Sequence, residues 1–131
     1  MKLLLDTHVW LWWNTAPEKL SVAAVKQITD PRNEVFLSAA SVWEMAIKRA
    51  LGKLPLPEPV ATYVSRRLAA DDIDSLPLSI EHAAAVETLD PRHSDPFDRV
   101  LIVQARHEGL RFLTADDKVL AYGTPAVDAR A

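Results

Sequence analysis

Four acidic residues that lie far apart in the chain are the strongest candidates for joint chemistry: Asp6, Glu44, Asp98 and Asp116. Carboxylates crowded into one site repel one another and raise each other's pKa unless a cation lies among them. Oxygen-only ligands favour hard cations, and Mg²⁺ typically takes a few carboxylates while keeping waters. Such sites suit phosphoryl chemistry, in which one or two metal ions activate water and stabilise the leaving oxygen.

The elements that would carry these acids alternate between short apolar strands and helices. Strands are expected at residues 2–5, 34–37, 73–78 and 111–113. Helices are expected to begin at residues 9, 21, 41, 60, 79, 95 and 115, and residues 124–131 form an edge strand or fray. This alternation predicts an α/β fold, a parallel sheet with helices on both faces. A length of 131 residues predicts a single domain spanning 1–131.

Two of the acids follow predicted strands directly. Asp6 comes after three leucines, and Asp116 lies just beyond the strand at 111–113. In open α/β sheets, ligands bind outside the carboxyl ends of the strands, where the strand order reverses. A charge at the end of a buried strand is costly unless it is compensated. Asp6 either fills a site at this edge or caps the helix that follows.

Helix capping is a competing interpretation for the other acids. Ser41 and Glu44 match the capping box S-x-x-E, in which the glutamate bonds back to the start of the helix. Asp95 precedes a proline and is expected to be an N-cap, and Asp98 lies in the first turn that follows. Asp116 could cap the last helix. Because a helix N-terminus favours negative charge, capping and metal binding are compatible. We expect Asp95 to cap and Asp98 to bind metal.

Four segments in this order resemble the PIN-domain ribonucleases, specifically the VapC-like toxins of bacterial toxin–antitoxin pairs. They are LLLDTHVWLWW, SAASVWEMAIK, DPFDRVLIVQA and FLTADD, and the resemblance covers nearly the whole chain. It implies a compact three-layer α/β/α sandwich with a short central parallel sheet. It also implies an endoribonuclease that depends on Mg²⁺, or on Mn²⁺ as a substitute.

The resemblance assigns the catalytic and metal-binding roles to the four acids already named: Asp6, Glu44, Asp98 and Asp116. The family's hydroxyl groups fall on Thr7 and Thr114, which could orient water. Asp95 and Asp117 are additional acids, either secondary ligands or caps. The implied partners are an RNA substrate, an antitoxin that blocks the site, and a second toxin chain in a homodimer. Operator DNA would be bound only through the antitoxin.

Composition bears on the partners and the compartment. The formal charge is −3, so RNA would need a local basic face, and Lys48 and Arg99 are the expected RNA contacts. The absence of cysteine fits a reducing cytoplasm. Asp6 and His8 interrupt the apolar N-terminal run, which argues against a signal peptide, and no stretch is long enough to span a membrane.

Other classes of protein fit less well. Haloacid-dehalogenase phosphatases need a second acid two residues after the first, where this chain has His8. The acid pair of receiver domains is missing, and the four histidines form no H-x-x-x-H zinc pair. The remaining alternative is a catalytically inactive PIN-like domain that binds RNA or another protein. The four tryptophans either stack on bases or pack in the core or a dimer interface, and packing is the favoured interpretation.

Overall fold

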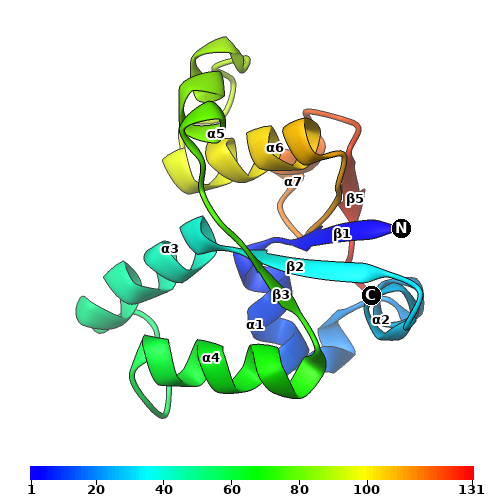
Figure 1. Ribbon diagram of the computed structural model, residues 1–131, viewed down its shortest axis with the longest axis vertical. Helices are drawn as coiled ribbons and strands as arrows, with labels where there is room; N and C mark the ends of the chain where they lie inside the picture. Colours follow the sequence, from blue (N-terminus) through cyan, green and yellow to red (C-terminus); the bar gives the residue numbers. More distant parts are fainter.

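A five-stranded parallel sheet forms the centre of the computed structural model, which describes residues 1–131 (Figure 1). The strands are β1 (Lys2–Leu5), β2 (Glu34–Ser38), β3 (Asp74–Leu76), β4 (Arg111–Thr114) and β5 (Ala126–Asp128). Their spatial order is β3-β2-β1-β4-β5, and all four neighbouring pairs are parallel. The predicted α/β class is therefore confirmed.

Helices cover both faces of this sheet. They are α1 (Thr7–Thr15), α2 (Val22–Thr29), α3 (Ala39–Ala50), α4 (Val60–Asp71), α5 (Ile80–Ala85), α6 (Pro96–Glu108) and α7 (Asp117–Leu120), with 3₁₀ turns η1 (Pro17–Lys19) and η2 (Val86–Thr88). Figure 1 shows α5, α6 and α7 on one side of the sheet and α1, α2 and α4 on the other. This is the predicted three-layer sandwich. None of the helices is long and apolar enough to cross a membrane.

The central strand β1 shows why the sheet needs two helical layers. Side chains alternate between the faces of a strand, and all three leucines of β1 are fully buried. Leu3 and Leu5 pack in the same cluster as Trp10, whereas Leu4 packs with Phe112 on the opposite face. A continuous apolar run is thus explained by burial on both faces, as in other parallel sheets.

The strand order reverses at β1, because β2 lies on one side of it and β4 on the other. The carboxyl ends of β1 and β4 are adjacent at this point. The backbone N–H of Asp6, which follows β1, donates to the carbonyl oxygen of Leu113 in β4 at 2.9 Å. The end of β4 at Thr114 therefore lies beside Asp6, as expected for residues at a switch point.

The start of α3 differs from the prediction. The helix begins at Ala39, and its N-cap is Ser38, whose hydroxyl accepts from the N–H of Ala40. Ser41 and Glu44 therefore lie within the helix, and the predicted capping box is wrong. The cause is that β2 continues to Ser38, so the helix starts as soon as the strand ends.

The C-terminal residues were expected either to form an edge strand or to fray. They form the edge strand β5, which pairs with β4.

Ser38 should contribute more to stability than Ser41. Its hydroxyl caps α3 and lies 2.5 Å from Oε1 of the buried Gln104. Ser38→Ala removes the cap and leaves that oxygen unpaired, so we expect the free energy of unfolding in urea to fall by about 2–3 kcal/mol. Ser41→Ala leaves the cap intact and should lower it by about 1 kcal/mol. A larger loss for Ser41→Ala would contradict the assignment of Ser38 as the cap.

Candidate active site

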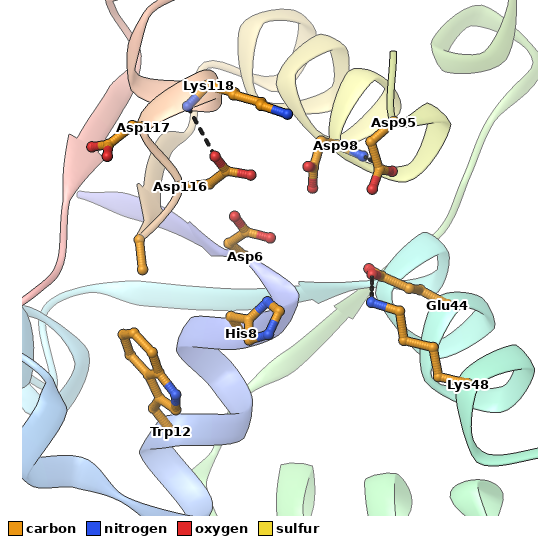
Figure 2. A pocket seen from close by; sticks show the side chains of 11 residues that line it. Asp6, His8, Trp12, Glu44, Lys48, Asp95, Asp98, Asp116, Asp117 and Lys118 are labelled. Atoms are coloured by element: carbon orange, nitrogen blue, oxygen red, sulfur yellow. Dashed lines mark hydrogen bonds and ion pairs between the residues drawn. The ribbon is translucent and has the colours of Figure 1, made fainter. Parts of the chain in front are cut away.

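A pocket of about 530 Å³ opens at the carboxyl ends of β1 and β4 (Figure 2). It contains all four predicted acids, and its lining residues are Asp6, His8, Trp12, Glu44, Lys48, Asp95, Asp98, Ala115, Asp116, Asp117 and Lys118. Residues up to 112 positions apart in the chain meet here because the strand ends and the starts of α1, α6 and α7 share one edge of the sheet.

Asp6 lies at the bottom of this pocket and is 4% exposed. Its Oδ1 accepts from the N–H of Thr7 at 2.7 Å, so it caps α1, and its Oδ2 accepts from the hydroxyl of Thr114 at 2.7 Å. Burial raises the pKa of Asp6, and these two hydrogen bonds act in the opposite direction. A carboxylate oxygen accepts more than one bond, so Asp6 keeps acceptor capacity toward the pocket.

Asp98 lies in the first turn of α6. Asp95 is the N-cap of this helix and accepts from the N–H groups of Phe97 at 2.9 Å and Asp98 at 3.3 Å, which confirms the predicted cap. Burial, followed by the nearby charge of Asp6, raises the pKa of Asp98 to about 7, against a lowering by the hydrogen bond from His93. Asp6 forms no ion pair, and Asp98 is paired only with His93, so no lysine or arginine is bonded to either carboxylate.

Glu44 differs from the aspartates because it already has a cation. It is 5% exposed, and its Oε2 accepts from Nζ of Lys48, one helical turn further along α3, at 2.6 Å. This bond raises the pKa of Lys48. Oε1 accepts from the hydroxyl of Thr7 at 2.8 Å, and that hydroxyl lies 2.9 Å from the hydroxyl of Ser41. Glu44 is thus fixed on the α3 side of the pocket by Thr7 and Lys48.

Asp116 both caps a helix and lines the pocket. As the N-cap of α7, its Oδ1 accepts from the N–H of Lys118 at 2.9 Å. Its Oδ2 lies 3.9 Å from Nε2 of His93. The neighbouring Asp117 is different: its side chain is 83% exposed, bonds to Arg130 and points away from the other acids in Figure 2. We therefore keep Asp116 in the acidic set and leave Asp117 outside it.

His93 belongs to the site but is not among the residues predicted from the sequence. It is buried, and ligand atoms of His93, Asp98 and Asp116 all lie within 4.8 Å of one another. The sequence shows only that His93 precedes Asp98 by five residues, in a turn between two prolines. No helical or strand periodicity extends across such a turn, so spacing alone did not place His93 against Asp98.

The structure does not support the prediction that Arg99 contacts RNA. Its guanidinium donates at 3.0–3.3 Å to the backbone carbonyl oxygens of four residues: Val86, Leu89, Asp90 and His93. It is not among the residues that line the pocket. Arg99 therefore holds the segment between η2 and α6 in place instead of facing the solvent beside Asp98.

Three of the four tryptophans lie in the core or at the pocket, whereas Trp43 is exposed on α3 and packs edge-on against Phe97. Trp10 is fully buried and packs at right angles to Tyr63, and Trp13 donates its ring N–H to Asp71, so both have packing roles. Trp12 instead lies at the edge of the pocket, where His8 contacts it edge-on. Packing is thus confirmed for Trp10 and Trp13, while Trp12 is accessible from the pocket.

The residues of the pocket fit a hard divalent cation. Asp6, Asp98 and Asp116 supply carboxylate oxygens, which are the ligands that Mg²⁺ and Mn²⁺ prefer. The raised pKa values of Asp6 and Asp98 show that positive charge would stabilise their ionised forms.

A second group with ligand-like spacing, formed by His82, His107 and Glu108, fits a metal less well. Nδ1 of His82 accepts from the N–H of Ser79 at 3.0 Å. In neutral imidazole the proton is then on Nε2, which lies 3.2 Å from Glu108 and donates to it. This nitrogen has no free lone pair for a metal, so the histidine serves as the capping partner of α5.

The fold and the pocket together define an α/β/α protein with a carboxylate site at the switch point of its sheet. A family model described as the PIN domain matches residues 3–124, and the chain belongs to this family.

Two proteins of Mycobacterium tuberculosis are similar in sequence. Ribonuclease VapC22 is 28% identical over 124 residues, which cover 94% of this chain and 93% of that protein. Ribonuclease VapC16 is 52% identical over 56 residues, which cover 43% of this chain and only 38% of that protein's length.

Two solved structures have a similar fold. One is VapBC2 from Rickettsia felis bound to a DNA fragment from their promoter, with a TM-score of 0.67, 14% identity, and coverage of 97% of this chain and 96% of that one. The other is a toxin–antitoxin complex from Klebsiella pneumoniae, with a TM-score of 0.61, 17% identity and 96% coverage of both chains.

The raised pKa of Asp98 predicts a pH-dependent gain in stability for Asp98→Asn in the absence of metal. The folded state holds this proton up to about pH 7, whereas the ordinary pKa is 3.8. The stabilisation from the proton is complete below pH 3.8 and is lost as the pH rises through about 7. Asparagine is neutral at every pH, so the variant avoids this loss. With chelator present, we expect its melting temperature to be several degrees above that of wild type at pH 8, and the difference in melting temperature to be smaller at pH 5.

Thermal unfolding at a series of pH values measures this effect, with Asp30→Asn as the control. Asp30 is paired with Arg32, which lowers its pKa to about 2, so that substitution should give no stabilisation at pH 8. A gap between Asp98→Asn and wild type that stayed constant from pH 5 to pH 8 would contradict the assignment.

Proposed function

We propose that this protein is an endoribonuclease that hydrolyses RNA phosphodiester bonds with a divalent metal ion, and that it acts as the toxin of a toxin–antitoxin pair. The observation that carries the proposal is the meeting of Asp6, Asp98 and Asp116 in one pocket, with Glu44 beside them. The similarity to Ribonuclease VapC22 over nearly the whole of both chains supports the same activity.

In this proposal the three aspartates hold Mg²⁺, or Mn²⁺ in its place. Glu44 was also expected to be a ligand, but both of its oxygens are already bonded, to Thr7 and to Lys48, so we assign it a different role. The cation would supply positive charge to the phosphate and make water a better nucleophile. Thr114 fixes Oδ2 of Asp6, and Thr7 fixes Oε1 of Glu44. Because each of these two carboxylates has one oxygen fixed by a threonine, they need not reorganise when the substrate binds. Such preorganisation is the main source of electrostatic catalysis. Glu44 is placed to orient water or to accept a proton from it.

The RNA strand is proposed to cross the pocket between α3 and α1. Lys48 lines the pocket, and its side chain is 42% exposed, which leaves its ammonium group accessible to a phosphate. Trp12 and His8 line the pocket on the α1 side and offer aromatic surfaces on which a base can stack. Lys48 therefore remains the predicted phosphate contact, now without Arg99.

Removal of an aspartate should abolish cleavage. With total bacterial RNA and Mg²⁺ or Mn²⁺, we expect the wild-type chain to produce discrete cuts that disappear with chelator. Asp6→Asn and Asp98→Asn should lower the cleavage rate at least about 100-fold, because each removes charge that holds the cation. Mapping of the 5′ ends measures both the rate and the site preference. Asp30→Asn, which removes a carboxylate at the other end of the molecule, should cleave at the wild-type rate.

Lys48→Gln belongs in the same experiment. It should raise KM and weaken the dependence of KM on salt concentration, because one phosphate contact is lost. Lys53→Gln makes the same change outside the pocket and should leave KM unaltered. Metal-independent cleavage, or full activity of Asp98→Asn, would contradict the proposed site. A folded wild-type chain that cut nothing with either metal would favour the alternative of an inactive RNA-binding domain.

An antitoxin is the proposed protein partner, and the exposed face of α3 is its proposed contact. Trp43 and Ile47 on this helix and Leu51 at its C-cap are spaced four residues apart and are 58%, 39% and 64% exposed. They adjoin Glu44 and Lys48, so a chain that covered them would lie beside the pocket. Both solved structures described above are toxin–antitoxin assemblies. We further propose that the chain forms a homodimer and reaches operator DNA only through the antitoxin.

Substitution of the α3 side chains should weaken antitoxin binding. We expect Trp43→Ser to raise the Kd for a purified cognate antitoxin at least about tenfold, because a large aromatic anchor is lost. Ile80→Ser is the matched control, since Ile80 is 86% exposed but lies on α5. Calorimetry measures the Kd, and light scattering on the isolated toxin tests the homodimer. Equal effects of the two substitutions would contradict this contact face.

A further inference from the structure

His93 is the one buried side chain at the pocket to which the proposed mechanism gives no task. It is 6% exposed and lies in the turn between η2 and α6. Its Nε2 is 2.7 Å from Oδ2 of Asp98 and 3.9 Å from Oδ2 of Asp116. The shorter distance is that of a strong hydrogen bond to a charged acceptor.

The backbone N–H and the backbone carbonyl oxygen of His93 are both hydrogen-bonded to side chains. Its N–H donates to the hydroxyl of Tyr122 at 3.0 Å, and that hydroxyl donates to the carbonyl oxygen of Asp90 at 2.8 Å. Its carbonyl oxygen accepts from the guanidinium of Arg99 at 3.1 Å, which also binds the carbonyl oxygens of Val86 and Leu89. The imidazole is therefore fixed relative to α6 before anything binds in the pocket.

The chemistry of the acceptor determines which atom carries the proton of this hydrogen bond. A carboxylate that holds a cation is ionised, and an ionised carboxylate only accepts hydrogen bonds. At 2.7 Å, Nε2 of His93 must then carry the hydrogen and donate it to Oδ2 of Asp98. A nitrogen that carries a hydrogen offers no lone pair to a metal, so His93 acts on the cation through Asp98.

We propose that His93 is a positioning residue that fixes the carboxylate of Asp98 and so orients Oδ1 toward the cation. This inference rests on the proposed function, because it assumes that Asp98 is a ligand. Groups that hydrogen-bond to metal ligands commonly fix the ligand's orientation, and their loss typically weakens metal binding about 10- to 100-fold. Tyr122 and Arg99 support the same task by holding the turn in which His93 lies.

Metal affinity in the absence of RNA tests this role without reference to activity. Mn²⁺ binding is measured from the paramagnetic resonance signal of the free ion, and Mg²⁺ binding by competition. His93→Leu keeps an apolar side chain in place but removes the donor, and we expect about 10- to 100-fold weaker binding of both ions. His93→Gln keeps an N–H donor and should restore affinity to within a few-fold of wild type. His107→Leu, at the exposed end of α6, is the control and should bind as wild type does.

The outcomes separate the possible failures. If wild type itself bound no Mn²⁺, the cation site of the proposed function would fail. If wild type bound Mn²⁺ and His93→Leu bound it equally well, only the positioning role would be overturned. A direct ligand role would also overturn it, and would be seen as no rescue by His93→Gln together with a greater loss of Mn²⁺ than of Mg²⁺ binding, because imidazole favours transition metals.

Tyr122→Phe keeps the inference testable if His93→Leu does not fold. It removes only the hydroxyl that binds the N–H of His93 and leaves the ring that packs against Arg92. A severalfold loss of Mn²⁺ affinity in this variant would support the positioning role, and unchanged affinity would overturn it.

Discussion

The repulsion between Asp6 and Asp98 is the constraint on which the rest of the pocket depends. Both carboxylates are buried, and the charge of Asp6 is among the causes that raise the pKa of Asp98. The fold compensates in part with the hydroxyl of Thr114 and the ring of His93. It also places these acids at helix N-termini, where the helix dipole favours negative charge. These contacts balance enough of the negative charge for the chain to fold, and the negative charge that remains is available to bind a cation.

Capping and pocket formation are performed by the same side chains. Asp6 caps α1 with one oxygen and binds Thr114 with the other, and Asp116 caps α7 while its second oxygen lies near His93. A carboxylate has two oxygens and about four acceptor positions, so one role does not exhaust it. Glu44 is the exception, because both of its oxygens are bonded within the protein and Lys48 neutralises it. Its pairing with Lys48 gives it a different part in the proposed chemistry.

A layer of supporting groups surrounds the acids and is drawn from distant parts of the chain. Thr7 and Thr114 hold the carboxylates of Glu44 and Asp6, while Arg99 fixes the turn that carries His93. Sites held this rigidly lose little energy to rearrangement when a substrate binds. The accumulation of like charge lowers the stability of the metal-free protein, which is the trade-off expected where function requires a destabilised site.

The sequence by itself determined the class of fold and the edge at which the acids gather. An apolar run such as Leu3 to Leu5 requires burial on both faces, and acids that follow parallel strands must share the carboxyl edge. The cap at Asp95 was equally local, because proline fixes the first helical position. Tertiary structure decided that α3 starts at Ala39 with Ser38 as its cap, that Arg99 lies outside the pocket, and that His93 packs against Asp98. Periodicity describes a single element, whereas these features depend on where β2 ends and how a non-periodic turn packs against α6.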